Sequence, residues 1–341
     1  MKPVNFRMSR RDFLRYAGTT GAGLLLAACN VKDKTMTEEQ PSELKTLMPT
    51  RASNTQTPFV PQESAATTAP KSGDAYLAVA RGSDVAAMTT MAVAAIGGME
   101  RFVKNGYDVI IKPNICTDYY PYEYGATTNP DVVATLILLA LGAGAKRVRV
   151  MDSPFGGTAQ SAYERSGIAA AVAAAGGEME VMNQNKFVNM QIPNHIDIET
   201  WNFYQDILNA DLVINVPIAK HHSSAGLTLG CKNMMGVITD RGGIHINLHK
   251  RIADLVSLVQ PELTIVDAVR TLMANGPTGG NLDDVRMTNT IIASHDIVAA
   301  DTFAATLFDQ TPDSIAYIRN AESLGLGTAD LSSIKLEEIT V

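Results

Sequence analysis

The stretch that most constrains the fold of this chain covers residues 211–236. It opens with an apolar run, LVINV at residues 212–216, of the kind that forms a strand buried on both faces. The run ends at Pro217, and a polar cluster that includes Lys220 and His221 follows before a helical segment. Strand, polar loop and helix in this order are the layout in which α/β proteins place their ligand sites. The stretch therefore predicts an α/β fold and locates a site.

Strand-like and helix-like segments alternate along the rest of the chain. Arg147 to Met151 is one strand-like run, and Glu262 to Val266 is another, which ends at Asp267. Asn129 followed by Pro130 predicts the start of one helix, and His245 to Val259 has the apolar spacing of another. We therefore expect a single α/β domain over residues 74–341. It should contain a mostly parallel sheet with helices on both faces, a Rossmann-like three-layer arrangement, and a small antiparallel excursion within residues 183–201.

Polar side chains follow four of the predicted strands at their carboxyl ends. Because these ends meet along one edge of a parallel sheet, the polar residues are expected to lie together where ligands bind. The lysines in the set give this edge a positive character that suits a small anion, such as a carboxylate or a phosphate. The alternative is that polar residues simply mark loops. The expected ligand-binding residues are Lys112, Asn114, Asp152, Lys232 and Asn233, and the expected catalytic residues are His221, Lys220 and Asp267.

The histidines are compatible with either a metal site or acid–base chemistry. His245 and His249 are four residues apart, so on a helix they share one face. With Asp267 and either His221 or His222, they could hold a divalent metal ion. Alternatively, His221 acts as a metal-free general acid or base, or the histidines have packing and capping roles. The patterns of zinc proteases, dinucleotide-binding proteins and P-loop proteins are absent from the sequence.

Charge and cysteine content argue against several classes of function. The formal net charge of −7 and the aromatic content of 6% do not suit a nucleic-acid-binding protein, which needs basic clusters or stacking platforms. Two of the three cysteines, Cys116 and Cys231, lie beyond residues 1–29, which are expected to be an export signal. They cannot supply the four thiolates of an ordinary iron–sulfur cluster or an all-cysteine zinc site. They could form one disulfide, which their spacing does not decide.

The N-terminus carries an export signal. SRRDFLR at residues 9–15 matches the twin-arginine pattern, and the apolar stretch that follows is shorter than the about 20 residues of a spanning helix. The stretch ends in LAAC, which predicts lipidation of Cys29; cleavage nearby with an incidental cysteine is the alternative. We expect residues 1–29 to be a signal peptide read by the twin-arginine translocation machinery. Residues 30–73, rich in Thr, Pro and Ser, should tether the domain.

These features predict an exported protein of the cell envelope that faces outside the cytoplasm. Its contact with the membrane would be through a lipid anchor only.

Several short motifs occur in a fixed order along residues 75–325. They are IIKPN at 110–114, TTNP at 127–130, DSP at 152–154, NVPIAKH at 215–221, LGCKNMMG at 229–236, VDA at 266–268 and NGP at 275–277. Together they resemble the bacterial and archaeal family known as domain of unknown function 362. The resemblance implies the fold and the position of the site, but no settled activity. Some members resemble iron–sulfur proteins through added ferredoxin-type cysteine motifs, which this chain lacks.

Three classes of function remain open at this point. The first is an enzyme acting on a small anionic substrate, in which lysines hold the anion, His221 is the acid or base, and Asp267 orients it or binds a metal ion. The second is a lipid-anchored protein that binds a solute or a metal. The third is a redox accessory protein with a bound cofactor. The sequence does not identify a cofactor, and a divalent metal ion is the one candidate.

Overall fold

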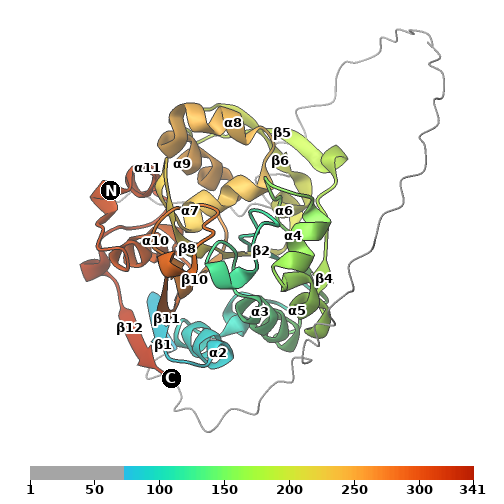
Figure 1. The fold of residues 1–341 in the computed structure, drawn as a ribbon, viewed down its shortest axis with the longest axis vertical. Coiled ribbons are helices and arrows are strands. Elements are labelled where there is room, and N and C mark those ends of the chain that lie inside the picture. Colours follow the sequence, from blue (N-terminus) through green and yellow to red (C-terminus); the bar gives the residue numbers. More distant parts are fainter. Residues whose placement is uncertain (1–72) are drawn as a thin grey trace, which may run out of the picture. The chain divides into compact units, whose positions relative to one another are not determined.

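The computed structural model describes residues 73–341 (Figure 1). The predicted signal peptide, Cys29 and the predicted tether up to residue 72 lie outside the described residues. Within residues 73–341, no helix combines the length and the apolar character that crossing a membrane requires.

A ten-stranded mixed sheet forms the centre of this domain. Its main path runs through β12 (Leu336–Thr340), β1 (Leu77–Arg81), β11 (Val285–Ser294), β10 (Leu263–Leu272), β7 (Leu212–Val216), β2 (Asp108–Pro113), β3 (Arg147–Val150) and β4 (Glu178–Met179). Two further strands, β8 (Ile218–His222) and β9 (Gly226–Thr228), extend from β10. The pairs from β10 to β4 are parallel, whereas β11 is antiparallel to both of its neighbours. The predicted mostly parallel sheet is confirmed.

Strand β7 is central in this sheet, as its apolar run predicted. It pairs in parallel with β2 on one side and with β10 on the other, and all five of its residues are buried. Its one polar residue, Asn215, is satisfied inside the protein because its side-chain amide donates to the carbonyl of Gly230 at 3.1 Å. A strand buried on both faces needs apolar side chains throughout, unless each polar group finds such a partner.

Helices cover both faces of the sheet, which confirms the three-layer arrangement (Figure 1). One face packs against α2 (Val85–Ala95), α3 (Pro130–Gly142) and α5 (Ile168–Ala174); α4 (Ala159–Arg165) adjoins α5. The other face carries α7 (Gly230–Asn233), α9 (Leu248–Val259), α10 (Ile297–Thr306) and α11 (Ala316–Ser323). The short helices α6 (Gln205–Asn209) and α8 (Arg241–Ile244) also belong to the described part of the chain.

Two local predictions are confirmed in detail. Helix α3 begins at Pro130, and the side chain of Asn129 caps it by accepting from the backbone N–H of Asp131 at 3.0 Å. The antiparallel excursion is a separate two-stranded sheet formed by β5 (Phe187–Gln191) and β6 (Thr200–Tyr204), although β6 continues beyond the predicted end at residue 201.

Three predicted boundaries were wrong. The polar cluster after Pro217 was expected to be a loop, but Ile218–His222 is strand β8, held by pairing with β10 and β9. The strand expected to end at Asp267 continues to Leu272 through a β-bulge. The helix expected from His245 begins at Leu248, after a single 3₁₀ turn. In the first two cases, pairing with other strands extends a strand that its own residues do not signal.

Candidate functional site

A cavity of about 460 Å³ lies beyond the carboxyl ends of β2 and β3. Segments that are far apart in the sequence line it: the residues that follow β2 and β3, one side of β8, helix α7, and the chain around α8. This is the edge at which parallel sheets bind ligands. The prediction that polar residues would gather here therefore agrees with the geometry.

The lining of this cavity is strongly basic. Asp152 is the one carboxylate that the described residues contribute to it. Four cationic side chains line the same space: Lys112, Lys220, Lys232 and Arg241. The local charge is thus opposite in sign to the net charge of −7 of the whole chain. A concave basic surface with low-dielectric walls attracts small anions.

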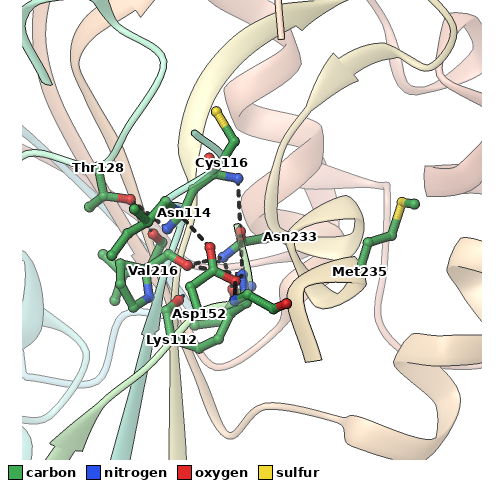
Figure 2. A network of polar contacts seen from close by, with 12 residues as sticks. Lys112, Asn114, Cys116, Thr128, Asp152, Val216, Asn233 and Met235 are labelled. Carbon is green, nitrogen blue, oxygen red and sulfur yellow. Dashed lines mark hydrogen bonds and ion pairs between the residues drawn. The ribbon is translucent and has the colours of Figure 1, made fainter. Parts of the chain in front are cut away.

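Lys112 is fully engaged by the protein. Its Nζ forms an ion pair with Oδ1 of Asp152 at 2.8 Å and donates to Oδ1 of Asn233 and to the carbonyl of Pro113, each at 2.9 Å (Figure 2). Burial lowers the pKa of Lys112 to about 8, against the opposing effect of Asp152. An ammonium group has three N–H donors, so this one has none left for a ligand. Lys112 therefore joins the strand ends rather than holding an anion.

Asn233 lies at the centre of this polar network (Figure 2). Its Oδ1 accepts from Nζ of Lys112 and, at 3.0 Å, from Nδ2 of Asn114. Its Nδ2 donates to Oδ1 of Asn215 at 2.8 Å and to the carbonyl of Lys112 at 3.2 Å. These contacts fix α7 onto the ends of β2 and β7 and thereby place the neighbouring Lys232 in the cavity wall.

Lys220 is the second saturated cation. It is buried in β8, and its Nζ donates to Oδ1 of Asn114 at 3.0 Å and to the carbonyls of Ala126 at 2.6 Å and Pro277 at 2.9 Å. Its Nζ also lies 3.4 Å from Sγ of Cys116. All of its oxygen acceptors are neutral, so its charge is hydrogen-bonded but not neutralised.

Lys232 differs from both of these lysines. Its side chain is only 8% exposed, and the one acceptor that its Nζ meets among the described residues is Sδ of Met235 at 3.6 Å. Thioether sulfur is a weak acceptor. Burial, together with the charges of Lys220 and Arg241, lowers the pKa of Lys232 to about 7. The ammonium group therefore has donors available on the cavity side.

Arg241 closes the cavity from α8. Its Nε donates to the carbonyl of Met235 at 2.9 Å, and one terminal nitrogen donates to the carbonyl of Ser153. Burial lowers the pKa of Arg241, and Asp152 opposes this effect. Like Lys232, it forms no ion pair within residues 73–341.

His222 adds a neutral donor to the cavity. Its Nδ1 accepts from the backbone N–H groups of Ser224 at 3.2 Å and Ala225 at 3.3 Å, which assigns the ring proton to Nε2. Burial, together with the charges of Lys232 and Lys220, lowers the pKa of His222 to about 3. The ring is therefore uncharged at neutral pH, and Nε2–H is the donor that remains for a ligand.

Two of the predicted catalytic residues do not line the cavity. In β8, successive side chains point to opposite faces, so Lys220 and His222 share the cavity side and His221 points away. His221 instead accepts from the backbone N–H of Gly276 at 3.1 Å. The carboxylate of Asp267 is buried elsewhere and accepts from the backbone N–H groups of Asn129 at 2.7 Å and Val269 at 3.0 Å.

The residues of the predicted metal site are not brought together. His222 and His245 line the cavity, but His249 does not; its ring stacks on Tyr317 with ring centroids 6.1 Å apart. Asp267 lies outside the cavity, as described above. Over residues 73–341, no group of three or more His, Cys, Asp or Glu side chains is arranged to hold a metal ion.

The two cysteines of the domain are free and buried, so they do not form the disulfide that the sequence left open. Cys231 is a buried residue of α7. Its backbone N–H donates to the carboxylate of Asp301 at 2.8 Å, and the backbone N–H of Gly230 donates to the same carboxylate at 2.6 Å. Burial raises the pKa of the Cys231 thiol. Cys116, in contrast, lines the cavity.

Sequence reasoning missed Cys116, Arg241 and Met235 as residues of the site. Cys116 had a signal: Lys112, Asn114 and Cys116 are spaced by two, so an extended chain presents all three on one side. No sequence signal pointed to Arg241 or Met235, because only the turn of the chain after α7 brings these two residues to the cavity.

Residues 109–306 match the model of one protein family, which is described as domain of unknown function (DUF362). The match covers more than half of the chain. This chain belongs to the DUF362 family. The resemblance indicated by its sequence motifs is confirmed, and every cavity-lining residue of this DUF362 protein, from Lys112 to Pro277, lies within the matched range.

Two comparisons extend this result for the DUF362 chain. It is 28% identical over 255 residues to the thylakoid-associated protein sll1697 of Synechocystis sp., an alignment that covers 72% of this chain and 76% of that protein. Among solved structures, it is similar to the lactate racemase apoprotein from Thermoanaerobacterium thermosaccharolyticum, with a TM-score of 0.41 and 11% identity. That alignment covers 64% of this chain and 54% of the racemase chain, so the chain spans about half the length of that structure.

Proposed function

We propose that this DUF362 protein is an enzyme that binds a small organic anion in the cavity and transfers a proton to or from it. One observation carries the proposal: the ammonium group of Lys232 is buried at the cavity wall and meets only a thioether acceptor within the described residues. A buried cation without a partner is costly because it has lost its hydration. A bound anion would supply the missing partner.

The neighbouring groups support a small anion as the ligand. Arg241 and Lys220 add positive charge, and Nε2–H of His222 adds an uncharged donor. The volume of about 460 Å³ falls within the range of about 300–1,000 Å³ that small-molecule sites occupy. A metabolite that carries one carboxylate or phosphate group fits this combination of size and charge.

Lys232 is also the best candidate for the acid–base group, in place of His221. Its pKa of about 7 means that both protonation states are populated near neutral pH, which is the condition for efficient general acid–base catalysis. Lys112 and Lys220 are fully hydrogen-bonded within the protein, so neither can pass a proton to a ligand without breaking these contacts.

Solvent deuterium exchange tests the proposal. The full chain would be incubated in D₂O with a panel of small carboxylates and phosphate esters, and loss of the C–H signals next to the acidic or carbonyl groups would be followed by ¹H NMR. We expect exchange with at least one compound for the wild type and none for Lys232→Met. Lys146→Met is the matched control, because Lys146 is exposed just before the amino end of β3, at the opposite edge of the sheet. Saturation-transfer signals without exchange would indicate a solute-binding protein instead.

We further propose that the protein works outside the cytoplasm on a lipid anchor. The twin-arginine pattern at residues 9–15 and the LAAC sequence that ends at Cys29 support this proposal.

A further inference from the structure

We propose that Lys232 forms an imine with a carbonyl-bearing anion of the 2-oxo acid class. This inference rests on the proposed function, because the anion site must exist for the carbonyl group to be held beside Nζ.

The hydrogen bonds of the three cavity lysines single out Lys232. Nζ of Lys112 has three oxygen acceptors, and so has Nζ of Lys220. An amine can attack a carbonyl carbon only through a free lone pair, and saturated ammonium groups do not release one without breaking this network. Lys232 meets only Sδ of Met235 among the described residues, at 3.6 Å, so losing a proton costs it no hydrogen bond to oxygen.

The surroundings of Lys232 favour the neutral, nucleophilic amine. The group is buried, and the cationic groups of Lys220 and Arg241 share its cavity; neither of these two forms an ion pair within residues 73–341. Burial in an apolar pocket and a nearby like charge are the two arrangements that activate lysine as a nucleophile. The pKa of about 7 agrees with this geometry.

The same surroundings define the class of substrate. A 2-oxo acid has its carboxylate one bond away from its carbonyl group. Of the cations that remain after Lys232 has reacted, Arg241 has N–H donors suited to the carboxylate, and Lys220 adds only the attraction of its charge. Nε2–H of His222 is suited to an uncharged oxygen. The ligand therefore needs one anionic end and one neutral carbonyl close together.

The reaction balances without a further reagent. The nitrogen forms a bond to the carbonyl carbon, the carbon–oxygen double bond breaks, and the oxygen leaves as water with two protons from the ammonium nitrogen. An ammonium and a ketone thus give a protonated imine and water, with no oxidation or reduction. The positive charge stays on the same nitrogen, so no new buried charge is created. A protonated imine draws electrons from the adjacent C–H bond, which connects it to the proposed proton transfer.

Reductive trapping tests the inference. The full chain would be incubated separately with glyoxylate, pyruvate and 2-oxoglutarate in the presence of cyanoborohydride, digested, and mapped by mass spectrometry. We expect one reduced adduct on the peptide that contains Lys232, formed on the order of a hundredfold faster than on exposed lysines, which have pKa values of about 10.4. Lys232→Arg should lose this adduct and keep the melting temperature of the wild type, whereas Lys146→Met should retain the adduct.

A parallel measurement of thermal stabilisation by the same three acids separates the two proposals. Stabilisation of the wild type without preferential labelling of Lys232 would overturn the imine and leave anion binding intact. If the three acids, acetate and phosphate all fail to stabilise the protein and Lys232 is not labelled, both proposals are wrong. Labelling spread evenly over exposed lysines counts against the imine in either case.

Discussion

The pKa of Lys232 links anion binding to pH. In the free protein this pKa is about 7, and a bound anion raises it by favouring the charged form. Affinity should therefore be constant below about pH 7 and fall by up to about tenfold per pH unit above it, because the ammonium must first regain its proton. Calorimetric titration over this range measures the effect. Lys232→Arg, which stays charged, should show a flat profile, and a wild-type profile equally flat to about pH 9 would refute the linkage.

The buried ion pair between Lys112 and Asp152 should be essential for stability. Asp152→Asn leaves the ammonium buried without its counter-charge, which costs about 3–5 kcal/mol in comparable pairs. Urea denaturation monitored by circular dichroism would measure the loss in the free energy of unfolding. Asp313→Asn, which breaks an exposed pair with Arg319, is the matched control and should leave the midpoint unchanged. Equal midpoints for the two variants would contradict the structural role of Lys112.

The alternation of side chains along strand β8 places His222 in the cavity and His221 outside it. His222→Phe should weaken anion binding by about tenfold, since it keeps a ring but removes the Nε2–H donor from the cavity side. His221→Gln should bind anions as the wild type does, because its contact is the backbone N–H of Gly276. Parallel titrations of both variants make the comparison. The reverse order of effects would restore the sequence-based prediction of His221.

The turn after α7 depends on close packing at Gly236. A Cβ atom at this position would lie 2.0 Å from Oδ1 of Asp152 and 2.4 Å from Nζ of Lys112. Gly236→Ala should thus push the ion pair apart and lower the melting temperature, at a cost of about 1–3 kcal/mol. Gly142→Ala is the matched control: no atom lies within 4 Å of its added Cβ, and alanine favours the end of α3. A stable Gly236→Ala protein would show that the pair can move.

At the scale of elements, the sequence predicted those helices and strands whose position depends on residues close together in the chain. The helix start at Asn129 and Pro130 and the buried strand β7 follow from capping chemistry and an apolar run. Strand β8 could not be predicted in this way, because its polar residues Lys220 to His222 become a strand only by pairing with β9 and β10. The predicted place of Asp267 in the site was wrong for a related reason. Its carboxylate accepts from the backbone N–H of Asn129, which is more than a hundred residues away in the sequence.

At the scale of the whole molecule, the site exists only when the sheet is assembled. Lys112, Asp152, Lys220 and Arg241 come from four segments that meet at one edge. The sequence predicted the edge at which these residues gather, whereas the anionic character of the ligand stays a prediction that the basic lining supports. It could not show which lysine has all of its N–H donors engaged. That depends on acceptors from other segments, such as the side-chain amide of Asn114 and backbone carbonyls of the surrounding loops.

The location of the whole protein in the cell is a separate prediction from its N-terminal sequence. In the natural host, Cys29→Ser should abolish incorporation of labelled palmitate and release the protein from membranes. Replacing both Arg10 and Arg11 by Lys should retain the chain in the cytoplasm. Fractionation and immunoblotting would measure both effects. Membrane association that survives the Cys29→Ser change would contradict the lipid anchor.

Calorimetric titration of the full chain with small carboxylates and phosphates at about pH 6.5 tests the central claim most directly. The claim is that the unsatisfied ammonium of Lys232 makes this cavity an anion site. We expect saturable binding of at least one anion to the wild type and to Lys146→Met, and affinity lower by tenfold or more for Lys232→Met, as the loss of about 1.5–3 kcal/mol from a charged hydrogen bond implies. Equal affinities of Lys232→Met and the wild type would contradict the claim.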